Sequence, residues 1–186
     1  GVLAMMRDCD VPTGAALGWQ LASGSSSDGH HIVAPEPQGI QASRAIDDAL
    51  RRADIDPADL CAVQAHATGT NLGDLAEARA LRSSLGPVAD SIPVYAPKGQ
   101  LGHLLGAAGS VEAILGFQAL REGILPQSMN ADPLDPGVDL AVTTSGPVKL
   151  PDHQSERFML KNAFGFGGHN ISLILAVPCS TAARLD

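Results

Sequence analysis

The chain has 186 residues, of which 45% are apolar and 3% aromatic, so it is expected to be globular with a sizeable core and not disordered. Its formal net charge of −8 argues against a nucleic-acid-binding protein, because phosphate groups would repel it. No apolar run is long enough to span a membrane, and the first residues lack the pattern of a signal peptide. Cys9, Cys61 and Cys179 are too irregularly spaced for a disulfide framework or a zinc site, which favours a reducing cytoplasm.

The first half of the chain alternates strand and helix patterns. Residues 14–23 predict a buried strand, and residues 24–38, rich in Ser, Gly and Pro, predict a loop. Apolar residues at helical spacing cover 39–53. A turn at 56–59 then leads to a nearly continuous apolar strand at 60–65, which indicates a strand covered on both faces.

The second half continues this alternation and ends in two strands. The predicted elements are a helix at about 72–85 ended by Gly86-Pro87, a strand at 94–96, a helix at about 103–122, an extended connection at 123–139 and strands at 157–160 and 171–177. This order predicts one α/β domain over residues 1–186, with a mixed β-sheet packed against α-helices. Because Gly1 opens inside an apolar run, we expect the chain to be a piece or a processed product of a longer protein.

Two histidines follow predicted strands and are surrounded by small residues. His66 lies in Ala65-His66-Ala67-Thr68-Gly69-Thr70, and His103 ends Lys98-Gly99-Gln100-Leu101-Gly102-His103. Side chains at strand ends of a parallel sheet gather at one edge. One such histidine would more often be structural, but two of them with a lysine indicate acid–base or oxyanion chemistry.

Lys98 and Glu112 are candidates for a buried ion pair. Glu112 falls on a mostly apolar predicted helix, where an unpaired carboxylate would be costly. A paired, buried Lys98 would bias the histidines toward their neutral forms. The alternative is a solvated lysine that follows a proline.

Three further features belong to the candidate site. Thr68 and Thr70 alternate, so both face a cleft or serve as turn and capping residues. Asp74 and Glu77 suit the positive first turn of the helix that follows. Residues 162–170 combine glycines with two phenylalanines, which predicts a tight, movable loop that approaches a ligand.

The other histidines give weaker signals. His30, His31 and His153 are interpreted as surface or loop residues, and His169 is ambiguous. No set of residues has the spacing of metal ligands, so no metal site is expected.

The three glycine-rich stretches together resemble motifs in the C-terminal half of the β-ketoacyl-[acyl-carrier-protein] synthases, which are thiolase-like condensing enzymes. Residues 65–77 resemble the first histidine motif, residues 98–112 the lysine and second histidine motif, and residues 162–170 the glycine-rich loop. The resemblance runs from about Leu17 to Val177. The sequence of residues 102–109 is more similar to that of the elongating, fatty-acid-synthase type than to that of modular polyketide synthases.

The resemblance implies an acyltransferase that condenses malonyl-carrier protein with an acyl thioester, with loss of carbon dioxide, to give 3-oxoacyl-carrier protein in fatty acid or related lipid synthesis. It implies catalytic roles for His66, His103 and Lys98, which would hold and organise the malonyl thioester oxygen. The implied supporting residues are Glu112, Asp74 and Glu77. The implied substrate- or phosphopantetheine-binding residues are Thr68, Thr70, Phe164, Phe166, Gly167 and Gly168, with Phe166 as an aromatic gate.

The resemblance also implies the partners. These are acyl carrier protein, which brings its own 4′-phosphopantetheine so that no separate cofactor is expected, the N-terminal half of the synthase, and a second subunit in a homodimer or heterodimer. The nucleophilic cysteine of the family belongs to the N-terminal half, so the isolated chain is expected to be inactive. Cys179-Ser180-Thr181-Ala182 echoes the nucleophile motif, but it follows the last strand and cannot be placed at a buried helix start.

Two departures and two rival functions remain. Lys161 and Ala163 stand where the family more often has a small polar residue and serine, which places hydrogen bonding in the loop, or a bound structural cation, in question. One rival is a non-catalytic, chain-length-factor-like subunit, although such a subunit has no need of His66, Lys98 and His103 together. The other is a malonyl decarboxylase whose nucleophile has been replaced.

Overall fold

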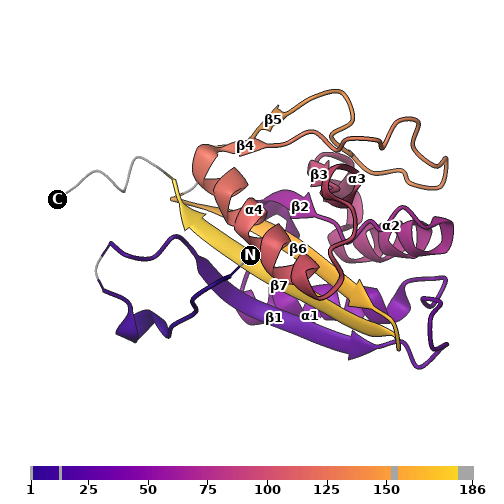
Figure 1. Ribbon diagram of the computed structural model, residues 1–186, viewed down its shortest axis with the longest axis horizontal. Helices are drawn as coiled ribbons and strands as arrows, with labels where there is room; N and C mark the ends of the chain where they lie inside the picture. The colour runs from indigo at the N-terminus through magenta and orange to yellow at the C-terminus, as the bar shows by residue number, and fades with distance from the viewer. Residues whose placement is uncertain (1, 13, 152–154, 180–186) are drawn as a thin grey trace.

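A mixed sheet forms the centre of the computed structural model, which describes residues 2–12, 14–151 and 155–179. Within these ranges the main sheet has five strands in the order β1 (Trp19–Ser27), β7 (His169–Pro178), β6 (Glu156–Gly165), β2 (Leu60–Gln64) and β3 (Val94–Tyr95). β7 pairs antiparallel with β1 and β6, whereas β2 runs parallel to β6 and β3. The predicted α/β fold with a mixed sheet is therefore confirmed (Figure 1).

Helices cover both faces of this sheet. α1 (Ile40–Ala53) and α2 (Asn71–Leu85) pack on one face, where Leu160 and Ile174 are fully buried. α4 (Ala108–Glu122) crosses the other face over Met159 and Leu175 (Figure 1). The shorter elements are η1 (Asp8–Asp10), η2 (Pro57–Asp59), η3 (Gly86–Asp90), α3 (Lys98–Leu101), η4 (Leu105–Ala107) and the paired strands β4 (Ile124–Leu125) and β5 (Val148–Lys149).

The first strand lies later in the sequence than predicted. β1 spans Trp19–Ser27, so the Ser-rich stretch taken for a loop is in fact a strand. Ser23 to Ser27 pair with Leu173 to His169 of β7. At Gly24 the helix α1 packs so closely on the strand that a Cβ would lie 1.9 Å from the Ala45 carbonyl oxygen. Tertiary packing against a helix thus overrides the weak strand propensity of serine and glycine.

The helix predicted at 103–122 begins only at Ala108. Gly102 has φ 73° and Leu105 has φ 50°, and neither value belongs to a right-handed helix. His103 therefore lies in an irregular segment between α3 and η4, not on a helix.

The glycine-rich stretch is a hairpin and not a free loop. β6 continues through Gly165 and β7 begins at His169, so only Phe166, Gly167 and Gly168 form the turn. Gly167 and Gly168 have φ of 81° and 76°, which glycine adopts most readily. The Gly167 N–H donates to Ile32 O at 2.7 Å and Gly168 O accepts from Asp28 N at 2.9 Å, so this turn is anchored to the loop after β1.

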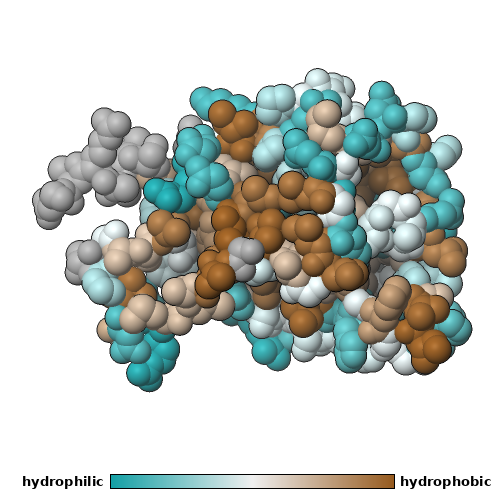
Figure 2. Space-filling view, in the orientation of Figure 1, coloured by the Kyte–Doolittle hydropathy of each residue, from teal (hydrophilic) through white to brown (hydrophobic). Residues whose placement is uncertain are grey.

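The outer surface is unevenly apolar. Apolar side chains gather over α4, where Ile114 is exposed (Figure 2). Among the described residues, no helix is long and apolar enough to cross a membrane.

Candidate active site

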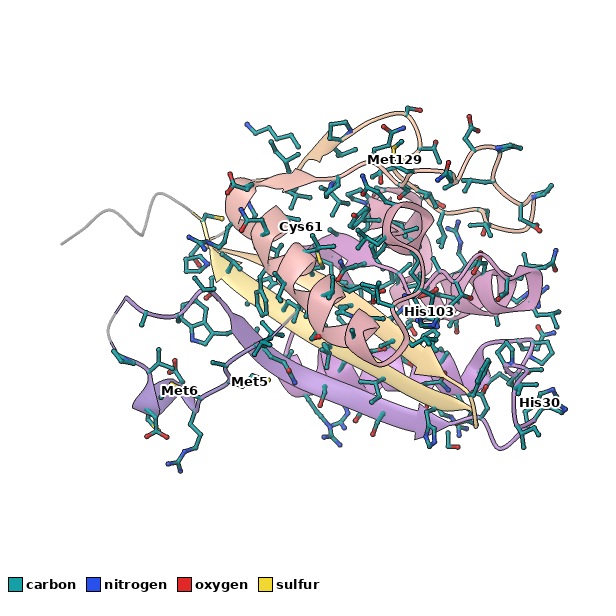
Figure 3. All side chains as sticks on the ribbon, in the orientation of Figure 1. Met5, Met6, His30, Cys61, His103 and Met129 are labelled. Atoms are coloured by element: carbon teal, nitrogen blue, oxygen red, sulfur yellow. The ribbon has the colours of Figure 1, made fainter. Side chains whose placement is uncertain are left out.

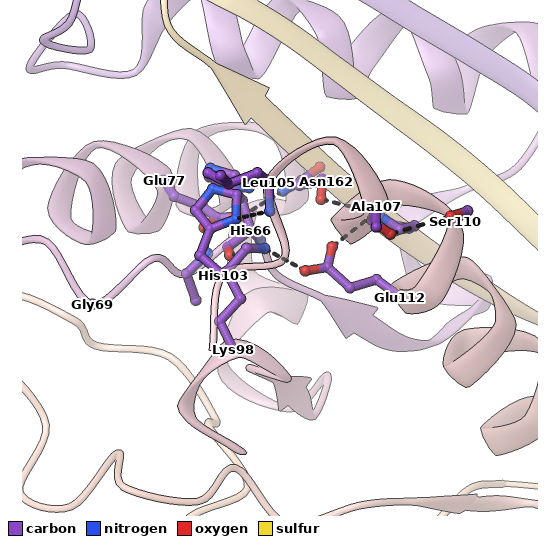
Figure 4. Close-up of polar contacts among 12 residues, drawn as sticks. His66, Gly69, Glu77, Lys98, His103, Leu105, Ala107, Ser110, Glu112 and Asn162 are labelled. Carbon is purple, nitrogen blue, oxygen red and sulfur yellow. Dashed lines mark hydrogen bonds and ion pairs between the residues drawn. The ribbon is translucent and has the colours of Figure 1, made fainter. Parts of the chain in front are cut away.

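The two histidines of the sequence motifs meet at one edge of the sheet. His66 lies just beyond the carboxyl end of β2, and His103 lies between α3 and η4. Their ring centroids are 5.8 Å apart, with the rings nearly perpendicular at 87° (Figure 4). Two imidazoles from separate segments therefore border the same space.

The main chain of His66 is held from both sides. Its N–H donates to Glu77 Oε1 at 2.8 Å, and its carbonyl oxygen accepts from Lys98 Nζ at 2.6 Å. The next residue, Ala67, has φ 34°, an unfavourable value for alanine, and its N–H donates to Glu77 Oε2 at 2.8 Å. The position of Glu77 in the sequence suggested a simple partner of the helix dipole. In the structure its carboxylate instead fixes the main chain of the histidine turn.

Glu77 is itself fixed from β6. Asn162 Nδ2 donates to Glu77 Oε1 at 3.0 Å, and Ser172 Oγ donates to Asn162 Oδ1 at 2.8 Å. Burial raises the pKa of Glu77, while the N–H donors of Ala67, His66 and Asn162 favour its charged form. Sequence reasoning missed Asn162 and Ser172 as supports of the site, because nothing in the strand pattern shows that they meet a helix residue.

The predicted Lys98–Glu112 pair is present and buried. Lys98 Nζ lies 2.5 Å from Glu112 Oε1, and both side chains are 3% exposed. The solvated alternative for Lys98 is therefore wrong. An unpredicted third member joins them: Lys161 Nζ lies 3.2 Å from Glu112 Oε2, and its side chain is 1% exposed.

The electrostatic environment keeps His66 neutral. Burial, followed by the positive charge of Lys98, the neighbouring His103 and the charge of Lys161, lowers the pKa of His66 to about 3. At neutral pH the ring therefore carries one N–H and no charge. Such an imidazole is able to donate a hydrogen bond to a developing oxyanion.

His103 has a defined hydrogen-bonding direction. Its Nδ1 accepts from the Leu105 N–H at 3.1 Å. In the neutral ring the proton is then on Nε2, which is left to donate outward. Leu105, with φ 50°, holds this turn in a conformation that a helix could not provide.

Thr68 and Thr70 lie side by side, as their alternation predicted. Their Oγ1 atoms are 2.9 Å apart, and no side-chain bond from Thr70 caps α2. Burial raises the pKa of Asp74, which accepts from the Gly69 N–H at 3.2 Å. A hollow of about 260 Å³ lies beside this turn and is lined by Thr68, Gly69 and Lys98, but neither histidine lines it.

The two phenylalanines of the hairpin occupy different environments. Phe164 is half-buried, and its ring centroid lies 5.6 Å from that of His66. Phe166 is 77% exposed at the turn, so the alternative that it is a core residue is wrong. Its role as a gate remains a prediction.

Phe166→Ala is expected to leave the melting temperature of the complete enzyme nearly unchanged, because the ring is exposed. The matched change Phe158→Ala removes a ring that is 8% exposed and should cost about 3–5 kcal/mol of unfolding free energy. A gate at Phe166 should alter the order of acyl loading and malonyl binding, measured by rapid-quench kinetics. A Phe166→Ala variant that melts at a lower temperature but loads acyl groups in the normal order would contradict the role of Phe166 as a gate.

No described cysteine lies near the two histidines. Cys61 is buried in β2, its Sγ donates to Phe158 O at 3.0 Å, and burial raises its thiol pKa to about 12. Cys179 is buried at the end of β7 opposite the hairpin. Cys9 is exposed in η1, and Met6, three residues before it in the chain, lies far from His103 (Figure 3). Ser180 to Ala182, the rest of the nucleophile-like stretch, lie outside the described residues.

The remaining histidines are placed outside this cluster. His30 is exposed, and His31 Nδ1 accepts from the N–H groups of Val33 and Ala34. His169 is exposed at the start of β7. His153 lies outside the described residues.

Two imidazoles, one of them neutral, therefore meet beside a buried lysine at the edge of a mixed sheet, an arrangement suited to stabilising negative charge on oxygen. Residues 17–132 match the family described as Beta-ketoacyl synthase, C-terminal domain. The chain belongs to this family, and the thiolase-like resemblance of its sequence is confirmed.

Individual relatives agree with this assignment. The chain is 45% identical over 153 residues to the 3-oxoacyl-[acyl-carrier-protein] synthase 2 of Mycobacterium tuberculosis (strain ATCC 25618 / H37Rv), covering 82% of this chain and 35% of the relative. The chain thus spans about a third of the length of the curated relatives it matches.

Solved structures are similar over most of the chain. One is a type II polyketide ketosynthase bound to a hexaketide and in complex with its acyl-carrier protein (TM-score 0.81, 26% identity, covering 87% of this chain and 39% of that one). Another is a ketosynthase in complex with its chain length factor from Xenorhabdus doucetiae (TM-score 0.71, 36% identity, covering 85% and 38%).

Proposed function

We propose that this chain supplies the oxyanion-stabilising part of a 3-oxoacyl-carrier-protein synthase. The whole enzyme condenses malonyl-carrier protein with an acyl thioester in fatty acid synthesis. The observation that carries the proposal is the meeting of His66 and His103, with His66 kept neutral and its main chain clamped by Lys98 and Glu77.

The residues divide the chemistry as follows. The bond between the malonyl carboxylate and its α-carbon breaks, carbon dioxide leaves, and the electron pair moves onto the thioester oxygen. His66 and His103 each donate an N–H to that oxygen as it becomes negative. The enolate carbon then attacks the acyl thioester of a cysteine from another part of the enzyme, and the cysteine thiolate is the leaving group.

The partners follow from this assignment. The carrier protein brings the phosphopantetheine arm, so the reaction needs no separate cofactor. The neighbouring hydroxyls of Thr68 and Thr70 are suited to donate hydrogen bonds to that arm. Phe164, whose ring lies beside that of His66, and the exposed Phe166 are suited to contact that arm on its way to His66. A second synthase subunit completes a homodimer or heterodimer.

The chain-length-factor alternative is not favoured. The half-buried His66 and the buried Lys98–Glu112 pair form a connected arrangement that a pocket-shaping subunit does not require. A decarboxylase with a replaced nucleophile would use the same residues, so it is separated from the proposal only by whether 3-oxoacyl product forms.

The test is a product assay with acyl-carrier protein and malonyl-carrier protein. A full-length synthase that carries this chain as its C-terminal part should form 3-oxoacyl-carrier protein, detected by mass spectrometry. Carbon dioxide release without that product would favour the decarboxylase. If the enzyme neither releases carbon dioxide nor forms the product, the proposed function is wrong.

The isolated chain should form no 3-oxoacyl product. Cys61 and Cys179 are buried away from the histidines, and Cys9 lies in the exposed η1 segment, so covalent catalysis lacks a thiol. Steady product formation that is abolished by Cys179→Ala would contradict this expectation.

A further inference from the structure

Lys161 is the member of the buried charge cluster that the condensation chemistry described above does not use. It lies on β6 beside Gln64 of β2, on the sheet face covered by α4. Its ammonium contacts Glu112 Oε2 at 3.2 Å, while Lys98 holds Glu112 Oε1 at 2.5 Å. One carboxylate is therefore shared between two buried ammonium groups, each less than 4% exposed.

This sharing leaves an excess of positive charge on the α4 face. The cluster of Lys98, Lys161 and Glu112 has two cations and one anion. The other buried carboxylate among the described residues, Glu77, lies on the opposite face, where its oxygens accept N–H groups from His66, Ala67 and Asn162. Burial lowers the pKa of Lys161, which means that the fold bears a cost for keeping this ammonium charged.

Lys161 is a buried charge that the Lys98–Glu112 pair does not need, and a buried ion pair is by itself weak evidence for a stabilising role. Glu112 would be matched one-to-one by Lys98 alone. The excess charge instead lies next to the His66 turn, since Lys98 Nζ contacts the His66 carbonyl oxygen at 2.6 Å and the charges of both lysines act on the His66 ring.

We propose that Lys161 is a positioning residue of the condensation site. It fixes the second oxygen of Glu112, so that Lys98 stays directed at the His66 turn, and its charge adds to the positive field that keeps His66 neutral. The groups facing the His66 ring and turn are Lys98, Lys161, His103, Glu77 and the Phe164 ring. This inference rests on the proposed condensing function.

The experiment replaces Lys161 by Met, which keeps the length of the side chain and removes the charge, in the full-length synthase. Lys161→Met should slow malonyl-carrier-protein decarboxylation about tenfold, the effect of one pKa unit of electrostatic interaction, with an unchanged KM. Its melting temperature should not fall, because the Lys98–Glu112 pair remains. Lys161→Arg should recover part of the rate, and Lys149→Met, at an exposed lysine of β5, should match the wild type.

A second readout does not depend on turnover. Histidine-labelled NMR of the full-length protein should show a higher pKa for His66 in Lys161→Met than in the wild type. An unchanged His66 titration, a wild-type decarboxylation rate, or a loss of rate that only follows a lower melting temperature would each overturn the proposal. A wild-type enzyme with no decarboxylation would contradict the proposed function instead, and the His66 titration would still decide the role of Lys161.

Discussion

His66→Ala and His103→Ala should each slow decarboxylation of malonyl-carrier protein by about 10²–10³-fold in the full-length enzyme. The two rings, 5.8 Å apart, border one space. The neutral His66 ring has one N–H to donate, and Nε2 of His103 is left to donate because its Nδ1 accepts from the Leu105 N–H. Removing either donor leaves the developing oxyanion with half of its hydrogen bonds. The measurement is carbon dioxide release with a radiolabelled malonyl carboxylate.

Acylation of the cysteine separates this role from general damage. The histidines serve the malonyl step, so transfer of an acyl group to the enzyme should survive better than decarboxylation in both variants. His30→Ala, at an exposed histidine in the loop after β1, is the matched control and should behave as wild type. Near wild-type decarboxylation by both site variants would show that the assignment of the oxyanion donors is wrong.

The pH profile offers a further check on His66. Its pKa lies near 3, below the ordinary value of 6.5, so the neutral ring should persist down to about pH 4. The native state binds fewer protons at His66 than the unfolded chain between about pH 3 and 6.5, so this group adds stability above pH 6.5 and loses it as the pH falls toward 3. A decarboxylation rate that drops with a pKa of 6.5, and does so only when His66 is present, would contradict this expectation.

The sequence predicted elements well where one local pattern decided them. α1 follows its apolar repeat from Ile40 to Ala53, and β2 follows its apolar run from Leu60 to Gln64. β1 was misplaced because Ser23 to Ser27 become a strand only through pairing with β7. The start of α4 was misplaced because the left-handed turn at Leu105 has no sequence signal in a leucine.

The sequence predicted those parts of the site where a charged residue interrupts an apolar pattern. Glu112 on an apolar helix required a cation, and Lys98 supplies it. Lys161 was seen only as a departure from a motif, because its partner lies 49 positions earlier and on another element. The contacts of Glu77 with the His66 and Ala67 N–H groups were likewise hidden, since the sequence suggested a helix-dipole role for Glu77 in the first turn, whereas α2 begins at Asn71 and places Glu77 in its second turn.

Glu112→Gln is expected to be the most destabilising single change in the charge cluster, at about 3–5 kcal/mol of unfolding free energy. Glu112 is the only carboxylate that contacts Lys98 and Lys161 among the described residues, at 2.5 and 3.2 Å. Its neutral replacement would leave two ammonium groups buried without a counter-charge. Glu122→Gln, at an exposed position near the end of the same helix, is the control and should change stability by less than about 0.5 kcal/mol.

Because the two lysines share one carboxylate, loss of a lysine and loss of Glu112 should have different effects on stability. Lys98→Met leaves Glu112 paired with Lys161, so its loss of unfolding free energy should be clearly smaller than that of Glu112→Gln. Its activity should nevertheless fall, because the His66 carbonyl loses the 2.6 Å hydrogen bond that fixes the histidine turn. Chemical denaturation of the full-length proteins measures the first quantity, and malonyl decarboxylation measures the second. Equal stability losses for Lys98→Met and Glu112→Gln would mean that Lys161 does not compensate Glu112, and the three-charge arrangement would then be wrong.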